Sequence, residues 1–370
     1  MRRILISALA LCAAACTTKP VTVEVANNGA ADLAWESIEV AWSELGGSVT
    51  PDNVVVKHCG EEIPSQVLIV GGKPATLLFQ SDLAAGATET FTVEAGVRAD
   101  YPSRAYGRFV PERLDDYAWE NDKVAFRAYG PALETAPGEM LVTPGFDAWV
   151  KCVDTLVVDA RYIRGNYHHN YGDGMDCYKV GRTLGAGASA PYAADTLWLS
   201  HNFESWERLA NGPIRTVVKF TYAPFDVDGT EVSLTKYISL DAHSHFNRIL
   251  NVYEGDFETL PVAAGVVRHD VKGVHEGEGW IAMYEAASDS ANPEEDGDMY
   301  FAVIQKDAQF AETLCGHMAA LRDVRSGEAV EYMAGSGWSG AGIGSLEEWC
   351  AIVEREAASF ANPVTVKVVR

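Results

Sequence analysis

The sequence predicts an all-β protein in which a small amino-terminal β-sandwich is followed by a large antiparallel β body and one carboxy-terminal helix. Short alternating apolar runs separated by glycine turns recur through the first hundred residues. Strand-like runs continue through the rest of the chain, and helical periodicity is nearly absent before residue 344. These three observations together favour packed β-sheets over a helical or mixed fold.

The amino terminus predicts export. Arg2 and Arg3 precede the apolar run 4–15, which is too short to span a membrane and ends at Cys16. This pattern is typical of a lipoprotein signal peptide over residues 1–15 with lipid on Cys16, and plain secretion after cleavage is the alternative. We therefore expect a lipoprotein of the bacterial outer membrane, periplasmic or surface-exposed, that meets the membrane only through its lipid anchor.

Residues 17–99 are predicted to form the small sandwich. Alternating or β-branched apolar runs begin near residues 21, 38, 54, 67, 77 and 90, and Gly46-Gly47 and Gly71-Gly72 separate some of them. Short strands at near-regular spacing with glycine turns are typical of such sandwiches. Residues 98–104, which contain Pro102, are the predicted linker.

Residues 104–370 are predicted to form one large unit. This length is too great for an immunoglobulin-size sandwich, so the strands must build a large sandwich or a barrel. At its end, Ser345 and Glu348 form a capping box, and an apolar stripe from Leu346 stops at Asn362-Pro363. The predicted strands lie near residues 124–129, 149–158, 196–200, 215–222, 232–240, 248–253, 280–284 and 300–304.

The charge balance excludes one class of partner. The chain has 29 basic and 52 acidic residues, a formal charge of −23, and no basic block. Nucleic acid is excluded because a polyanion needs clustered Lys and Arg. A small anionic ligand is compatible with a few local arginines.

Five of the seven cysteines follow Cys16, and their spacing fits no zinc pattern. Buried unpaired cysteines are favoured over a disulfide.

The first chemically rich stretch is 117–131. Glu120, Asn121 and Asp122 stand just before a predicted strand that carries Arg127. An arginine on a sheet face can form a bidentate ion pair with a carboxylate, which belongs either to a substrate or to a neighbouring acid of the protein.

The second stretch, 167–181, is a glycine-rich loop with several proton-transfer groups. It contains two histidines, three tyrosines and two aspartates, which can donate or accept protons in general acid-base work, and His168, Asp176 and Tyr178 are among them. A calcium loop is the alternative, because Asp173 and Asp176 resemble oxygen ligands, although the fuller EF-hand spacing is missing.

The third stretch, 241–248, contains His243 and His245 two residues apart. On a strand they would point the same way, into a cleft, onto zinc with a third ligand from elsewhere, or into solvent. Trp338 lies in a glycine run without the lysine and spacing of a phosphate loop. The many Trp and Tyr residues suit sugar stacking and a sandwich core almost equally.

At these motifs the sequence resembles the Bacteroidetes lipoproteins that carry domain of unknown function 4861 and are encoded in polysaccharide-utilisation loci. The resemblance runs from about residue 104 to the carboxyl end. The stretches that carry it are 106–113, 119–131, 167–181, 209–215, 244–247, 337–338 and 347–349.

The resemblance implies a galactose-mutarotase-type sandwich that acts on plant or algal oligosaccharides. It implies a dehydratase that removes water from a non-reducing-end uronic acid and leaves a 4,5-unsaturated uronyl end. A polysaccharide lyase or sugar epimerase on the same fold is the first alternative, and a non-catalytic glycan-binding lipoprotein is the second.

That chemistry needs a base for the C5 proton, an acid for the departing C4 hydroxyl and a cation beside the substrate carboxylate. No cofactor is predicted, although a divalent metal is compatible with the residues. The candidate catalytic residues are His168, Tyr178 and His245, and the candidate substrate-binding residues are Glu120, Asn121, Arg127, Asp176, Arg215 and Trp338.

Overall fold

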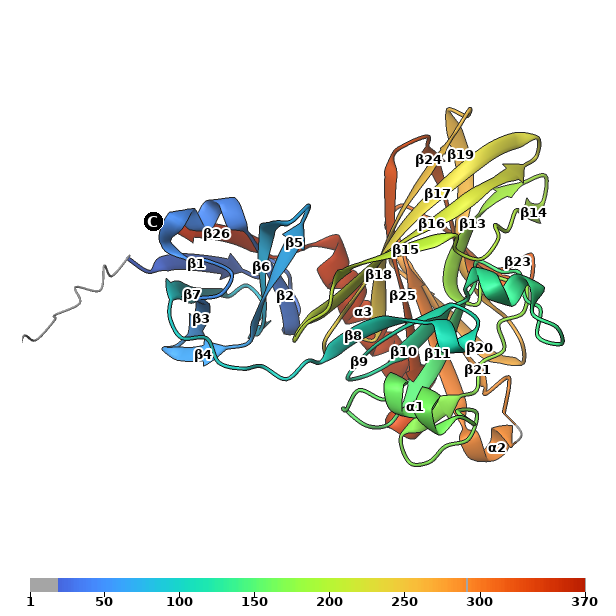
Figure 1. Ribbon diagram of the computed structural model, residues 1–370, viewed down its shortest axis with the longest axis horizontal. Coiled ribbons are helices and arrows are strands. Elements are labelled where there is room, and N and C mark those ends of the chain that lie inside the picture. The colour runs from blue at the N-terminus through green and yellow to red at the C-terminus, as the bar shows by residue number, and fades with distance from the viewer. Residues whose placement is uncertain (1–18, 291, 370) are drawn as a thin grey trace, which may run out of the picture.

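The computed structural model describes residues 19–290 and 292–369. The predicted signal peptide and Cys16 lie outside these residues. The described chain forms a small β-sandwich and a much larger β body, joined by an extended linker (Figure 1). The predicted all-β class with a small first sandwich, a large antiparallel supersandwich and a carboxy-terminal helix is confirmed. None of the helices in the described part is long and apolar enough to cross a membrane.

The small sandwich packs a five-stranded sheet, in the order β26-β1-β7-β3-β4, against the three-stranded sheet β2-β6-β5. Period-two alternation drives this packing: in β1, Val21, Val23 and Val25 point into the core and the intervening residues face outward. The strands are β1 (Val21–Ala26), β2 (Leu33–Ala41), β3 (Val54–His58), β4 (Glu61–Ile63), β5 (Ser65–Val70), β6 (Lys73–Leu83) and β7 (Thr88–Ala95).

The carboxyl end departs from the predicted domain division. Strand β26 (Thr365–Val369), which the prediction placed in the second unit, pairs antiparallel with β1. The chain therefore returns to the first sandwich, where Val366 and Val368 pack against its core. An edge strand without a partner would expose a row of backbone hydrogen-bonding groups, and β26 covers that edge.

The large body is a supersandwich with one sheet of eight strands in the order β15-β16-β17-β18-β25-β22-β21-β20. Two five-stranded sheets, β14-β13-β19-β24-β23 and β12-β11-β10-β9-β8, form the opposite layer, and one apolar core joins all three sheets. Its strands are β8 (Ala105–Val110), β9 (Asp116–Asn121), β10 (Ala125–Ala128), β11 (Phe146–Lys151), β12 (Gly174–Asp176), β13 (Ala186–Ala193), β14 (Thr196–Leu197), β15 (Ser205–Ala210), β16 (Arg215–Val227), β17 (Thr230–Asp241), β18 (Phe246–Gly255), β19 (Thr259–Val267), β20 (Val271–Gly277), β21 (Trp280–Ala286), β22 (Asp298–Ile304), β23 (Gln309–Leu314), β24 (His317–Arg325) and β25 (Ala329–Trp338).

Helix α3 (Leu346–Ala361) begins as predicted at Ser345, whose side chain accepts a hydrogen bond from the Glu348 backbone N–H. Trp349, Val353 and Ala357 pack on the outer face of the eight-stranded sheet. This explains why β22 is a continuous apolar run: both of its faces are buried, one in the sandwich and one under α3.

The predicted strand 149–158 is wrong in its second half. Strand β11 ends at Lys151, and residues from Val158 to Arg164 form the short helix α1. A seven-residue helix has too few turns to produce a clear periodic signal. The remaining short helices are α2 (Pro293–Asp296) and the 3-10 turns Trp42–Ser48, Pro111–Arg113, Pro131–Thr135 and Ser339–Ala341.

The five described cysteines are unpaired, as expected, although only Cys177 is buried and Cys350 is partly buried. The remaining three, Cys59, Cys152 and Cys315, are exposed, so the expectation of burial is wrong for them.

Gln66 fastens the two sandwiches together. Its amide group donates to the Arg215 carbonyl at 2.9 Å and accepts from the Ile214 and Arg215 N–H groups at 3.0 and 2.8 Å. We expect Gln66→Ala to lower the free energy of unfolding by about 1–3 kcal/mol, because three buried backbone groups lose their partner. Urea unfolding measures this loss, with Gln80→Ala, whose amide also bridges the sandwiches but is less buried, as the milder comparison. A loss below about 0.5 kcal/mol for Gln66→Ala would contradict it.

Candidate functional site

Two of the three predicted stretches meet on the outer face of the sheet β8–β12. Arg127 of β10 stands directly opposite Asp147 of β11 in the antiparallel register. Its Nη2 lies 2.5 Å from Asp147 Oδ2 and 3.0 Å from Asp176 Oδ2, and its Nε donates to Asp147 at 3.0 Å. All three side chains are nearly fully buried. Arg127 therefore binds two carboxylates of the protein, which was one of the two interpretations that the sequence allowed. The acids are Asp147 and Asp176, and not the neighbouring Glu120 or Asp122.

Aromatic rings surround this buried cation. The Arg127 guanidinium carbon lies 5.1 Å from the ring centroid of Tyr129, 5.2 Å from that of Trp149 and 5.5 Å from that of Tyr167. Rings at this distance stabilise a cation that has left water. The cluster is thus a charged core under the loop 165–173, with the apolar residues of α1 beside it.

Asp116 adds a third carboxylate, 3.7 Å from Arg127 Nη1. Burial raises the pKa of Asp116 from 3.8 to about 7, although Arg127 and Arg113 oppose the shift. Burial and the neighbouring Asp147 also raise the pKa of Asp176 well above its ordinary value. One arginine cannot neutralise three ionised acids, so the cluster retains protons that exposed carboxyl groups would have lost.

This shift predicts a pH dependence of stability. The folded protein keeps a proton on Asp116 up to about pH 7, whereas the unfolded chain releases it near pH 3.8, so stability falls as the pH rises through this window. We expect Asp116→Asn to raise the free energy of unfolding by about 1–2 kcal/mol at pH 8 and to change it little at pH 4. Urea unfolding at both pH values checks this, with the exposed Asp154→Asn as control. Equal shifts at both pH values would refute the explanation.

His168 lies at the rim of this cluster. Its Nδ1 is 3.1 Å from the Asp176 carbonyl oxygen and 3.7 Å from Asp176 Oδ2, and 49% of its side chain is exposed. A proton on Nδ1 is oriented by Asp176, which leaves the Nε2 lone pair facing away from it. A half-exposed imidazole in this tautomer can accept a proton from a bound molecule.

Tyr167 stands beside His168, with ring centroids 4.9 Å apart. Its hydroxyl oxygen accepts hydrogen bonds from Arg113 Nε at 3.0 Å and from Arg127 Nη1 at 3.3 Å. Guanidinium groups only donate, so the phenol proton points away from both arginines. Tyr167 can therefore donate its proton to a bound molecule.

Arg113 supplies the accessible positive charge. Its side chain is 26% exposed, and its partner Glu139, at 2.7 Å, is 58% exposed. A rim pair of this kind exchanges its carboxylate easily, because the exposed carboxylate loses little on returning to water. Arg127, in contrast, is already saturated by buried acids.

Glu120 and Asn121, which we predicted to bind substrate, are buried structural residues. Glu120 binds Lys151 at 2.7 Å and accepts from the Val157 and Val158 N–H groups at the start of α1. The Asn121 amide donates to the carbonyls of residues 241 and 244 and so fixes the turn between β17 and β18. Both side chains are fully enclosed, so neither can reach a substrate.

Three other predicted residues also lie away from the cluster or inside the core. Tyr178 packs on Phe301 between the sheets, 2% exposed, and burial raises its pKa well above the ordinary value, so it is unsuited to act as a base. His245 contacts the Ser336 carbonyl at 3.1 Å under α3, and burial lowers its pKa. Trp338 is buried and donates from Nε1 to the Asp296 carbonyl at 2.7 Å.

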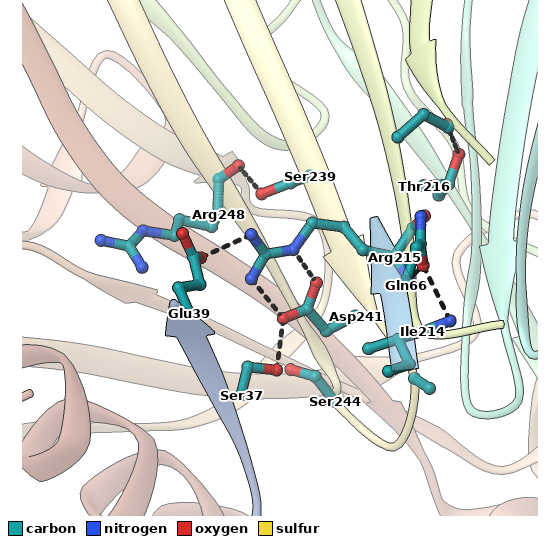
Figure 2. A network of polar contacts seen from close by, with 12 residues as sticks. Ser37, Glu39, Gln66, Ile214, Arg215, Thr216, Ser239, Asp241, Ser244 and Arg248 are labelled. Carbon is teal, nitrogen blue, oxygen red and sulfur yellow. Dashed lines mark hydrogen bonds and ion pairs between the residues drawn. The ribbon is translucent and has the colours of Figure 1, made fainter. Parts of the chain in front are cut away.

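Arg215 lies between the two sandwiches (Figure 2). It binds Asp241 through Nε at 2.5 Å and Nη2 at 2.7 Å, and Glu39 through Nη1 at 2.6 Å. This arginine is saturated by the protein's own acids and is distant in the fold from the loop of His168. Arg113 at the cluster rim has a more exposed side chain than Arg215.

Residues considered as alternative metal ligands form ion pairs with other side chains. Asp173 is paired with Arg164 at 3.1 Å, and His243 with Asp122 at 2.8 Å. Across residues 19–290 and 292–369, no three His, Cys, Asp or Glu side chains are arranged to hold a metal ion.

Tyr167, Arg113, Asp116 and Asp147 were not among the predicted site residues, although Tyr167 and Arg113 lie in stretches that the sequence singles out. One signal was available: Asp147 interrupts the apolar run 146–150 of β11, and a lone acid in a buried strand demands a buried partner. Arg113 belongs to the stretch 106–113, but only folding shows that it reaches Tyr167.

Fold and site together define a two-sandwich, all-β protein with a buried arginine–carboxylate cluster and a histidine–tyrosine pair at its rim. The chain belongs to the family described as Domain of unknown function (DUF4861), whose model matches residues 25–366. It is 37% identical over 231 residues to an uncharacterized protein, P7, of Formosa agariphila, and the match covers 58% of each chain. The chain thus matches less than two thirds of that relative's length.

Two solved structures share the fold. One is a protein in the glycosyl hydrolase family 38 from Enterococcus faecalis, with a TM-score of 0.52, and the other is an α-mannosidase from Enterococcus faecalis V583, with a TM-score of 0.51. Each is 9% identical, and the superposition covers 95% of this chain but 47% and 46% of theirs. At this identity the likeness concerns the fold, and this chain spans about half the length of either protein.

Proposed function

We propose that the protein is a carbohydrate-active hydro-lyase that removes water from a non-reducing-end uronic acid of an oligosaccharide. The observation that carries the proposal is the convergence at one rim of a half-exposed imidazole, a phenol and an accessible guanidinium. These are the base, the acid and the carboxylate partner that elimination beside a carboxylate requires.

In the proposed reaction, Arg113 exchanges Glu139 for the substrate carboxylate and so favours negative charge that develops at C5. His168 Nε2 takes the C5 proton, and the electrons of that C–H bond form the C4–C5 double bond. The C4–O bond breaks, and Tyr167 gives its proton to the departing hydroxyl, which leaves as water. Proton transfer from His168 to Tyr167 through solvent restores both groups.

The buried cluster has a supporting role in this proposal. Arg127 and Arg113 both donate to the Tyr167 oxygen, so they stabilise the negative charge that this oxygen carries after it loses its proton. Asp176 orients the His168 ring through its carbonyl. The carbohydrate class is supported by the fold, which recurs in a family 38 glycosyl hydrolase, and is proposed here for this chain.

Product analysis tests the proposal. The protein is incubated with short oligosaccharides that end in glucuronate or iduronate, followed by mass spectrometry and ultraviolet absorbance. Loss of one water with new absorbance from a conjugated carboxylate supports a hydro-lyase. Release of a sugar fragment with the same absorbance identifies a polysaccharide lyase instead, and an unchanged mass with altered stereochemistry identifies an epimerase. Binding without any change across the panel indicates a glycan-binding protein.

A further inference from the structure

A cavity of about 590 Å³ lies between the two sandwiches, and none of the residues that line it belongs to the His168 rim. Strand β2 of the small sandwich, the outer face of the eight-stranded sheet and the end of α3 form its walls. A volume of this size falls within the range of small-molecule sites. Because three parts of the chain converge there, the cavity exists only when both sandwiches are docked.

The polar groups of its wall are held in fixed pairs. Arg215 joins Asp241 and Glu39 (Figure 2). Arg248 binds Glu331 through Nε at 2.5 Å and Nη2 at 3.1 Å. The partly exposed pair of Arg248 and Glu331 presents donors and acceptors at defined positions, while the buried Arg215 holds Glu39 and Asp241 in place. Such planar pairs suit the adjacent hydroxyl groups of a sugar, which donate and accept at once.

An aromatic ring stands at the same cavity. Trp35 is 53% exposed and stacks on His243, with ring centroids 4.0 Å apart. A large exposed indole is unusual in a protein interface unless a ligand or partner covers it, and indole rings stack on flat apolar faces.

Both stacked residues have strained backbones. Trp35 has a φ of 55° and His243 a φ of 68°, in the left-handed region that favours glycine. Side-chain acceptors hold each one there: the Trp35 N–H donates to Asp82 at 2.9 Å and the His243 N–H to Asp122 at 2.6 Å. Strain that is maintained at two touching residues indicates that their positions serve a purpose other than stability.

The charged residues that line the cavity favour a neutral ligand over an anionic one. Five acids, Glu36, Glu39, Asp241, Glu331 and Glu356, face four cations, Arg215, Arg248, Lys306 and Arg322, and three of the acids are already paired with arginines. Glu356 and Glu36 are left at the α3 side, where Ser359 donates to Glu36 at 2.9 Å. Burial and Glu36 raise the pKa of Glu356 to about 7. With five acids against four cations, the wall has no excess positive charge to attract an anion, whereas a neutral polyol can hydrogen-bond to these carboxyl groups.

We propose that this cavity is a binding site for a neutral sugar unit, free or at the end of an oligosaccharide, with Trp35 as its stacking platform. The proposal does not depend on the elimination chemistry at His168. It gives the docked small sandwich a role in recognition, since β2 supplies Trp35, Glu36 and Glu39.

The test uses the full chain carrying His168→Ala, so that turnover cannot obscure binding. Calorimetric titration with neutral di- to tetrasaccharides of glucose, galactose, mannose, xylose and rhamnose is compared with titration of glucuronate. We expect one neutral sugar to bind, and Trp35→Ala to weaken it about tenfold or more. Trp206→Ala, which removes another exposed tryptophan away from the cavity, should leave the affinity unchanged.

A fold control accompanies these variants. Trp35→Gly suits the φ of 55°, so it should unfold at an equal or higher temperature than the parent while also losing the sugar. The proposal is overturned if no neutral sugar binds, if Trp206→Ala weakens binding as much as Trp35→Ala, or if glucuronate binds at this cavity more tightly than every neutral sugar.

Discussion

His168→Ala lowers the turnover of uronate-terminated oligosaccharides by about 10²- to 10⁴-fold, the range expected when a general base is removed. Tyr167→Phe has an effect of the same order, because the ring and its stacking remain while the transferable proton is lost. The expected change lies in kcat, since neither group is proposed to contribute most of the ground-state binding. Initial rates of unsaturated product formation measure it.

Two neighbours provide matched controls. His169 follows His168 in sequence but packs on Tyr171 instead of Asp176. Tyr178 is enclosed in the core. His169→Ala and Tyr178→Phe should therefore retain kcat within about threefold. Loss of activity in either control with full activity in His168→Ala would show that the active site lies elsewhere. It would contradict the proposed roles of His168 and Tyr167.

Arg127→Met lowers the free energy of unfolding by about 3–5 kcal/mol, the cost expected when one partner of a buried charge pair is removed. Asp147 and Asp176 remain enclosed with no other arginine or lysine at salt-bridge distance among the described residues, and only the half-exposed His168 imidazole lies within 3.7 Å of Asp176. The methionine side chain preserves much of the apolar stem that packs among Trp149 and Tyr167, so the loss reports mainly on charge.

The loss should depend on pH and on the acids. Arg127 opposes the raised pKa values of Asp116 and Asp176, so these values rise further without it and the destabilisation is larger at pH 8 than at pH 4. Asp147→Asn in the Arg127→Met background should recover part of the stability, because one unpaired charge disappears. Urea unfolding of the four proteins of this double-mutant cycle measures the coupling. A loss below about 1 kcal/mol would mean that the cluster is not held by its charges.

The prediction from sequence succeeded where the signal is local. Helix α3 was predicted from Ser345 and Glu348, three residues apart, and from an apolar stripe within sixteen residues. Strands β1, β2, β3, β5, β6 and β7 of the small sandwich were predicted from alternating or β-branched apolar runs, whereas the short polar strand β4 was not. Strand β26 was overlooked because its partner β1 lies at the other end of the chain, and no local pattern encodes that pairing.

Candidate site residues were harder to predict, for a physical reason. Residue type identifies a group that can transfer a proton or hold a charge, but burial decides whether it does. Tyr178 and His168 are equally plausible bases in the sequence, yet the fold encloses the first between sheets and leaves the second half-exposed. Arg127 and Arg215 are equally plausible carboxylate partners, and the fold saturates both with acids of the protein.

The excess of acids over bases, the β-strand periodicity, the capping of α3 and the clustering of proton-transfer groups near His168 are properties of the sequence itself. They follow from composition and from contacts within a few residues. The Arg127 cluster, the two arginines on Tyr167 and the cavity at Trp35 were decided by tertiary structure. Arg127 and Asp176 are 49 residues apart, and only the antiparallel register of the sheet β8–β12 brings such groups within hydrogen-bonding distance.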